Sequence, residues 1–359
     1  MINSSQTIKF KKAWFDWKKY IKLQKEKILE RVNKFPGRLY LEIWGKFMYD
    51  AHASRVLPWF DPESKKKIFI GLRDQVEILF CINAKDFLSG RQLSNQDIDY
   101  QNYIFDMIKQ IEKNIWVKPQ IVINMIDKNN IAEIIKKFMT KMKKIWYKVY
   151  QRFIIDGYPN PKFVLSNNWY GKDEYIKIKK NINLILVTGA ASNSGKMSTC
   201  LGQIYLDHKK WIESGYAKYE TFPIWNLPLN HPVNLAYEAA TADIWDFNCI
   251  DKYHKEAYGE KSVNYNRDVE AFEIVMNIAK KIVKKNNYMT TYKSPTDMWI
   301  STAWYCIIDN KVVSKTSLQE IKRRKKRYKQ MIDRNNWKIK WIKICEKLEK
   351  KCERYIKKM

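Results

Sequence analysis

Short apolar runs that alternate with amphipathic stretches constrain the fold of this chain more than any other feature of its sequence. The runs at 76–83 (VEILFCIN), 119–126 (PQIVINMI) and 182–188 (INLILVT) are nearly continuous in apolar residues. Such runs are typical of strands that are buried on both faces of a parallel sheet. Helical periodicity fills the stretches 97–114 and 130–145 between them. This alternation predicts an α/β fold with a doubly wound, mostly parallel sheet of the Rossmann-like or phosphate-loop-like kind.

The same periodicity divides the chain into three parts. Further strands are expected at 38–44, 147–155 and 162–166, and further helices at 12–35, 232–242, 267–286 and 295–305, with another that opens at Asp61. Proline, asparagine and aromatic residues crowd 219–235, which is typical of a long ordered loop beside a cleft. We therefore expect an α/β domain at 1–215 and a loop-rich, helical region on the substrate side at 216–310. A basic helical tail is expected at 311–359.

The segment 184–201 (LILVTGAASNSGKMSTCL) combines an apolar strand, a loop of small residues, Gly195-Lys196 and an apparent helix. Phosphate-binding loops are built in this way, because backbone N–H groups and a helix N-terminus face the phosphate and a lysine neutralises its charge. The match to G-x-x-x-x-G-K-[ST] is imperfect, because Ala190 and Met197 replace a glycine and a hydroxyl residue of the pattern. The expected cofactor is ATP or another nucleotide with magnesium, and the alternative is an ordinary strand–turn–helix junction. The candidate cofactor-binding residues are Ser192, Asn193, Ser194, Gly195, Lys196, Met197, Ser198 and Thr199.

Polar side chains elsewhere supply candidates for catalysis and for binding a substrate. The candidates for holding magnesium are Asp243, Asp246 and Asp251, with Glu220 and Glu238 nearby in the sequence, and their spacing defines no metal site. Arg267 would clamp an anion, and His231 or His254 would act as a general base. The alternative for each is a structural role, such as a helix cap at Asp268. The catalytic candidates are Lys196, His231, Asp243, Arg267 and Asp268, and those on the substrate side are His52, Arg55, Glu220, Asn226, Asn234, Glu238, Asn264, Asn266, Lys293 and Asp297.

The chain is strongly basic, with a formal net charge of +29. Its basic residues are mostly lysine, 55 of 67, whereas recognition of bases and phosphates favours arginine. Residues 311–359 carry 19 basic and 5 acidic side chains, so this tail is where a nucleic acid would bind. A solvated helical face explains the same charge.

Cysteine usage and the N-terminus indicate a reducing compartment. The six cysteines include no Cys-x-x-Cys pair, and Met1 to Lys12 lacks the apolar run of a secretory signal. No stretch approaches 18 apolar residues, which argues against a membrane span. We expect a cytoplasmic protein whose partner is a small phosphorylated ligand, with homo-oligomer formation left open.

Glycine is scarce in this chain and tryptophan is abundant. There are 11 glycines and 14 tryptophans, whereas glycine usually makes up about 7% of a chain. Trp59 in PWFDP and Trp169 in NNWYG stand where turns favour glycine. We therefore hypothesise that UGA codons that mean glycine are read here as tryptophan. The alternative is a protein that is simply rich in tryptophan.

Several long strings resemble one bacterial family. They are ILERVNKFPGRLYLE, DAHASRVLPWFDP, GYAKYETFPIWNLPLNHPVNLAYEAATAD, VNYNRDVE and YKSPTDM. Over about 13–325 the chain is similar to the proteins called domain of unknown function 1846, or uncharacterised protein family 0371. The resemblance implies a multidomain α/β fold with a phosphate-loop-like segment, similar to APGPGSGK in the family, and brings no established reaction.

The resemblance also bears on the tryptophans and on the end of the chain. The family pattern has glycine at eight positions where this chain has tryptophan, whereas Trp225 matches a true tryptophan. Those eight are Trp14, Trp44, Trp59, Trp146, Trp169, Trp211, Trp299 and Trp304. Family members continue into another α/β region after the stretch that matches SLQEIKRR, so we expect this chain to be a fragment.

Three functions stay open on the sequence. The leading one is binding of a nucleotide or other phosphorylated ligand at 184–201, with ATP-dependent phosphoryl transfer as the reaction class if the protein is an enzyme. The first alternative is a Rossmann-like enzyme that acts on a sugar phosphate or dinucleotide, with His231 or His254 as acid and base. The second is a noncatalytic nucleic-acid-binding protein that uses 311–359.

Overall fold

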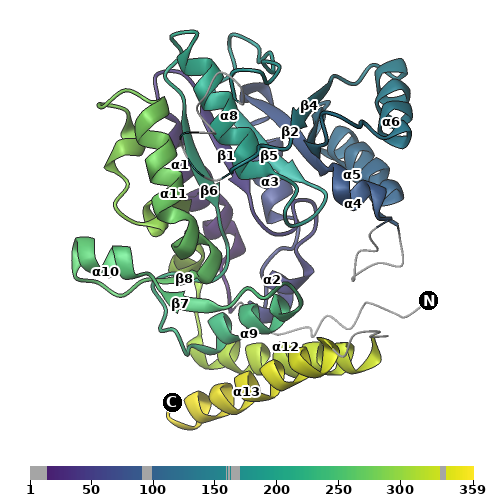
Figure 1. Cartoon of the computed structure of the whole chain (residues 1–359). Helices are drawn as coiled ribbons and strands as arrows, with labels where there is room; N and C mark the ends of the chain where they lie inside the picture. Colours follow the sequence, from purple (N-terminus) through teal and green to yellow (C-terminus); the bar gives the residue numbers. More distant parts are fainter. Residues whose placement is uncertain (1–13, 91–98, 159, 161, 163–169, 332–336) are drawn as a thin grey trace.

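A seven-stranded sheet forms the centre of the molecule in the computed structural model (Figure 1). The structure describes residues 14–90, 99–158, 160, 162, 170–331 and 337–359. The strand order is β4-β3-β2-β5-β1-β6-β9, and all neighbours are parallel. The strands are β1 (Leu39–Ile43), β2 (Val76–Asn83), β3 (Gln120–Ile126), β4 (Val149–Phe153), β5 (Leu184–Gly189), β6 (Gly215–Tyr219) and β9 (Trp299–Ile300). Every residue of β1, β2 and β6 is buried, as continuous apolar runs between two helical layers require.

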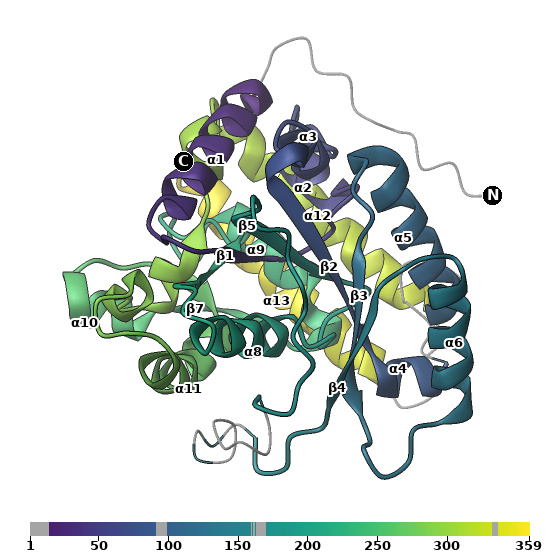
Figure 2. The same ribbon diagram turned by 90° about the horizontal axis from the view of Figure 1, so that it is seen from above.

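Helices cover both faces of this sheet (Figure 2). On one face α8 (Lys196–His208) packs against α11 (Asn266–Ile282), and on the other α3 (Ser64–Ile70) packs against α1 (Trp17–Val32) and α5 (Tyr100–Ile115). The shorter α4 (Ala84–Leu88) and α6 (Glu133–Lys144) lie beside β3 and β4. The predicted doubly wound, mostly parallel α/β fold is therefore confirmed.

A third group of helices lies beyond the carboxyl ends of the strands, at the bottom of Figure 1. It consists of α9 (Pro232–Ala240), α12 (Asn310–Gln330) and α13 (Trp337–Lys357), which pack on one another, with α2 (Ala51–Val56) beside α12. Val313, Ile321 and Tyr328 of α12 and Leu348 of α13 are buried. The basic segment that was expected to form a helical tail thus forms two helices that pack on the molecule through apolar side chains.

Smaller elements connect these layers. A two-stranded antiparallel sheet pairs β7 (Asn248–Ile250) with β8 (Val263–Tyr265), and α10 (Lys252–Tyr258) lies between them in the sequence. The short 3-10 helices are η1 (Arg73–Gln75), η2 (Ala242–Ile244), η3 (Tyr288–Thr291), η4 (Pro295–Met298) and η5 (Ala303–Cys306).

The region after residue 215 departs from the sequence-based expectation. The helix expected at 295–305 is wrong, because Trp299 and Ile300 form strand β9 and pair with Lys218 and Tyr219 of β6. Strands β6 and β9 belong to the same sheet as β1, so the sheet continues across the domain boundary expected at 215. The strand expected at 162–166 lies mostly outside the described residues.

Five tryptophans have a left-handed backbone conformation. The φ angle is 74° at Trp59, 60° at Trp116, 66° at Trp146, 63° at Trp211 and 60° at Trp245. Glycine adopts this conformation freely, whereas the Cβ atom of another residue crowds the neighbouring carbonyl oxygen. Three of the eight positions at which the family pattern has glycine therefore have a backbone suited to glycine.

The remaining members of that set of eight are placed differently. Trp44 stacks on Tyr265 with ring centroids 5.2 Å apart, and Trp299 is buried and donates a hydrogen bond to Asp268. Trp304 is 40% exposed. Trp169 lies outside the described residues.

Candidate site at the carboxyl edge of the sheet

The expected phosphate loop lies at the middle of the sheet. Strand β5 is flanked by β2 on one side and β1 on the other, and residues 190–195 connect it to α8. In open α/β sheets, ligands bind outside the carboxyl ends of the strands, where successive connections diverge to opposite sides. From β2 the chain runs outward through β3 and β4, whereas from β5 it runs through β6 to β9 on the opposite side. The loop therefore occupies the position at which such sheets bind ligands.

Two asparagines from neighbouring strands fix the conformation of this loop. Asn83 Nδ2 donates to the carbonyl oxygen of Asn193 over 3.0 Å, and Asn124 Nδ2 donates to that of Ser194 over 2.8 Å. Gly195 has a φ of +83°, and a Cβ atom there would lie 2.7 Å from Asn124 Cγ. Only glycine fits this position without movement of Asn124.

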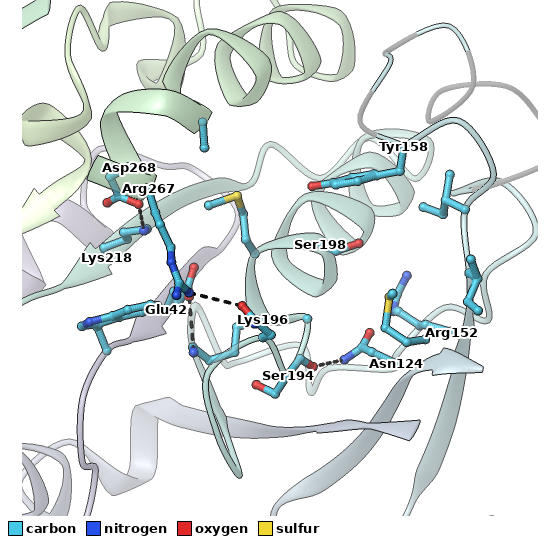
Figure 3. Close-up of a pocket in the computed structure, with 18 of the residues that line it drawn as sticks. Glu42, Asn124, Arg152, Tyr158, Ser194, Lys196, Ser198, Lys218, Arg267 and Asp268 are labelled. Carbon is cyan, nitrogen blue, oxygen red and sulfur yellow. Dashed lines mark hydrogen bonds and ion pairs between the residues drawn. The ribbon is translucent and has the colours of Figure 1, made fainter. Parts of the chain in front are cut away.

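Lys196 is the first residue of α8, and its side chain is buried in a polar setting (Figure 3). Its Nζ lies 3.6 Å from Glu42 Oε1 and 4.8 Å from the centre of the Trp44 ring. The other carboxylate oxygen of Glu42 accepts a hydrogen bond from the Tyr216 hydroxyl over 2.6 Å. The lysine thus has a nearby counterion but no close hydrogen bond to it.

Further charged groups from β6 and α11 complete this side of the site. Lys218 donates to Asp268 and, over 2.9 Å, to the Tyr265 hydroxyl. Burial acts to lower the pKa of Lys218, but the Asp268 and Glu42 carboxylates outweigh it and hold that pKa above its ordinary value. This lysine is therefore charged at neutral pH.

Arg267 reaches from α11 toward the loop. Its Nη1 donates to the Asn193 side-chain oxygen over 3.4 Å, and its Nε lies 2.5 Å from Asp246 Oδ1. Burial raises the pKa of Asp246 to about 6, although Arg267 acts in the opposite direction. The predicted anion clamp thus lies beside the predicted phosphate loop.

The loop, Lys196, Lys218 and Arg267 line a cavity of about 350 Å³ that we call the first cavity. Four basic and three acidic side chains line it. The basic ones are Arg152, Lys196, Lys218 and Arg267, and the acidic ones are Glu42, Asp173 and Asp268. Ser194 and Ser198 of the loop and of the first turn of α8 also face it (Figure 3). Within the described part of the chain, the buried Ser194 hydroxyl has no hydrogen-bond partner. The first cavity can therefore accept an anionic group and offers it hydrogen bonds.

A second cavity of about 280 Å³ lies on the other side of Trp44 and Lys196, which line both. It lies between the loop residues Ala190–Ser192, the ends of β1 and β6, and helix α9. The predicted residues Ser192, His52, Glu220 and Asp243 line it. Thus the catalytic candidates Lys196, Arg267 and Asp268 lie at the first cavity, and Asp243 lies at the second.

The other predicted residues serve local structure outside both cavities. His231 caps α9, with Nδ1 accepting from the Val233 N–H and Nε2 2.7 Å from Asn310 Oδ1. Burial lowers the pKa of His231 to about 4, so it is a neutral cap near pH 7. His254 lies 3.1 Å from the Ser294 hydroxyl. Neither histidine lines the first or the second cavity, where it would act as a general base.

The remaining predicted polar residues follow the same structural pattern. The Asn234 side chain makes hydrogen bonds to the backbone N–H and carbonyl groups of Ile224. The side-chain oxygens of Asn264 and Asn266 accept from backbone N–H groups near β8. The Asp297 carboxylate accepts from the Lys293 and Ser294 N–H groups. Arg55 forms an ion pair with Glu320, and Glu238 accepts from the Asn248 N–H. Asn226 is partly buried, and its side-chain oxygen has no partner within the described residues.

Sequence patterns alone did not reveal the site residues that the strands themselves supply. Glu42, Asn124, Arg152 and Lys218 lie within or at the ends of strands and face the first cavity. A polar residue within an apolar strand near its carboxyl end is the signal that would have found them. Only the strand order shows which of these ends meet.

The described ranges contain neither a cluster suited to a metal ion nor a helix suited to a membrane. No group of three or more His, Cys, Asp or Glu side chains there is arranged to hold a metal ion. Likewise, none of the helices in those ranges has the length and apolar character needed to cross a bilayer.

Fold and site together define a doubly wound α/β protein with a polar cavity beside the glycine-containing turn between β5 and α8. Residues 13–353 match the family described as "Domain of unknown function DUF1846, N-terminal", and the chain belongs to this family. The resemblance expected from the sequence strings is thereby confirmed.

Curated relatives carry names that state no activity. The UPF0371 protein of Streptococcus uberis is 42% identical over 315 residues, which are 88% of this chain and 62% of that protein. The UPF0371 protein of Corynebacterium efficiens is 41% identical over 311 residues, or 86% of this chain and 61% of the relative. The chain thus spans about three fifths of the length of the curated relatives it matches.

Proposed function

We propose that this chain binds a phosphorylated small molecule, with the phosphate held between the 190–195 loop, the N-terminus of α8 and the Arg267 side chain. The observation that carries the proposal is the first cavity. A glycine-containing strand–loop–helix turn opens into it together with four basic side chains.

The backbone of the loop supports this assignment. Asn193 and Gly195 both have positive φ values, 63° and 83°, and alternation of left-handed and right-handed residues turns successive N–H groups toward one point. Gly195 is the N-cap of the 13-residue helix α8 and provides no side-chain cap. The first N–H groups of a helix lack intrahelical partners and carry a partial positive charge, which favours a phosphate.

The charged side chains support it as well. The Lys196–Glu42 distance of 3.6 Å is longer than a hydrogen bond, so a phosphate oxygen can bind the ammonium group without first breaking a close ion pair. Arg267 would bind a second oxygen from the opposite side. A nucleotide and a sugar phosphate both present such a group. ATP-dependent phosphoryl transfer is the reaction class we propose if the ligand is a nucleotide.

Thermal melting with inorganic phosphate, pyrophosphate and Mg-ATP tests the proposal. A ligand at about one hundred times its dissociation constant adds roughly 2.7 kcal/mol of stability, which raises the melting temperature by several degrees. Lys196→Ala is expected to weaken binding at least tenfold, because charge-assisted hydrogen bonds contribute roughly 1.5–3 kcal/mol.

Lys255→Ala is the matched control, since it removes the same charge from the exposed surface of α10. It should leave the ligand-induced shift unchanged. Equal shifts in the two variants, or no shift in a wild-type protein that melts cooperatively, would contradict the proposal. A shift with Mg-ATP alone would identify a nucleotide as the ligand.

A further inference from the structure

The second cavity contains two polar atoms that nothing in the described residues satisfies. They are Glu220 Oε2 at the end of β6 and His52 Nε2 on α2, and both atoms are buried. Buried polar groups are almost always hydrogen-bonded, because an unpaired one costs roughly 1–3 kcal/mol. Two such atoms in one cavity indicate a bound polar molecule.

Glu220 has the properties of a neutral carboxylic acid. It is fully buried, and its other oxygen is 3.4 Å from the Tyr265 hydroxyl. Burial raises its pKa well above the ordinary value, although Lys218 acts in the opposite direction. A protonated carboxyl group both donates and accepts a hydrogen bond.

His52 provides a complementary acceptor. Its Nδ1 lies 3.2 Å from the buried Glu320 carboxylate, which accepts hydrogen bonds only. Nδ1 must therefore carry the proton, and burial lowers the pKa of the ring despite Glu320. In this tautomer Nε2 is an acceptor. A hydroxyl group, which donates and accepts, matches both Glu220 and His52.

The walls of the second cavity favour an uncharged ring. Phe47, Tyr103, Phe222 and Tyr237 line it, and aromatic faces suit the C–H faces of a sugar ring. Two buried cations of its lining are engaged elsewhere: Lys65 donates to the Trp44 carbonyl oxygen over 2.8 Å and lies 3.4 Å from Asp50. Arg324 donates to Glu320 over 3.0 Å. Lys46 is an exposed cation of the lining and lies over the Tyr103 ring. The buried part of the second cavity thus suits an uncharged group better than a second phosphate.

Lys196 and Trp44 line both cavities, so the two cavities adjoin at these side chains. We propose that the second cavity binds the neutral, hydroxylated ring of a sugar phosphate, with Glu220 and His52 hydrogen-bonded to its hydroxyl groups. This inference rests on the proposed function, because the phosphate of the same molecule lies in the first cavity.

Titration calorimetry with inorganic phosphate, glucose 6-phosphate, glucose 1-phosphate and ribose 5-phosphate tests this subsite. At least one sugar phosphate should bind tenfold or more tightly than inorganic phosphate, since each added hydrogen bond contributes up to about tenfold. Glu220→Ala should remove about tenfold of that advantage and leave the affinity for inorganic phosphate unchanged. Glu220→Gln, which still donates and accepts, should retain it.

The possible failures are distinguishable. Phosphate binding without any advantage for the three sugar phosphates overturns the second subsite and leaves the proposed function intact. An advantage that persists fully in Glu220→Ala also overturns it. The comparison of ligands on the wild-type protein decides the question even if Glu220→Ala does not fold.

Discussion

Replacing the tryptophans at positions 59, 116, 146, 211 and 245 together by glycine is expected to raise the free energy of unfolding by about 4 kcal/mol. Their φ angles lie between 60° and 74°, and this conformation costs a residue with a Cβ atom roughly 1–2 kcal/mol. The greater freedom of glycine in the unfolded chain offsets part of each gain. The five residues lie in separate turns, so their effects should add.

Little packing is lost at the three most exposed of these positions, whereas Trp59 and Trp245 are 45% exposed and lose more. Trp146 and Trp211 are 86% and 85% exposed, and Trp116 contributes mainly a contact with Arg73, whose guanidinium lies 4.8 Å from the ring centre. Urea unfolding at 25 °C measures the gain. Trp17→Gly is the control, because Trp17 begins helix α1 and packs partly buried against the core, so its loss should destabilise the protein by about 1 kcal/mol. A quintuple variant no more stable than the parent would contradict the account.

The same backbone evidence bears on the codon hypothesis. Trp59, Trp146 and Trp211 were singled out by the family pattern, and the structure adds Trp116 and Trp245. Peptide masses of the protein from its native source would show which residue stands at each position. Trp44 matters most for function, because its ring forms the wall between the two cavities.

Removal of the Glu320 carboxylate has the second large expected effect. This fully buried side chain accepts hydrogen bonds from Arg55 at 2.7 Å, from Arg323 at 2.6 Å and from Arg324 at 3.0 Å, and it contacts His52. Burial acts to raise the pKa of Glu320, but the surrounding arginines and the hydrogen bond with His52 hold that pKa far below its ordinary value. Breaking a buried ion pair on one side costs about 3–5 kcal/mol, because the remaining charges lose their counterion.

Glu320→Ala should therefore destabilise the protein by about 3 kcal/mol in urea unfolding. The value is at the lower end of that range because Arg55 and Arg323 are 35% and 38% exposed. Glu346→Ala, on the exposed face of α13, is the control and should change stability by less than about 0.5 kcal/mol. Equal urea midpoints for the two variants would show that the ion pairs of Glu320 do not hold α12 against α2.

Local patterns in the sequence were sufficient for the strands and helices that form one continuous signal. The run at 76–83 became β2, and the helices expected at 97–114 and 130–145 became α5 and α6. The loop before Lys196 was also found from its local motif. In each case the information lies within one short window of sequence.

Features that depend on distant partners could not be found in this way. Strand β9 has only two residues, Trp299 and Ile300, and exists because β6 offers it a free edge. The basic composition of 311–359 suggested a solvated face, whereas Glu320 and a few apolar residues fix α12 on the molecule. Glu42 and Lys218 are neighbours only because β1 and β6 pair.

Selective labelling of Ser-Gly pairs would test the proposed phosphate site most directly. The chain contains three such pairs, which end at Gly90, Gly195 and Gly215. Carbonyl-¹³C serine combined with ¹⁵N-glycine therefore selects three amide signals in this 43.2 kDa protein. We expect the Gly195 signal to shift progressively as inorganic phosphate is added, while Gly90 and Gly215 stay in place. A Gly195 signal that does not move, or that moves only together with the other two, would contradict phosphate binding at the N-terminus of α8.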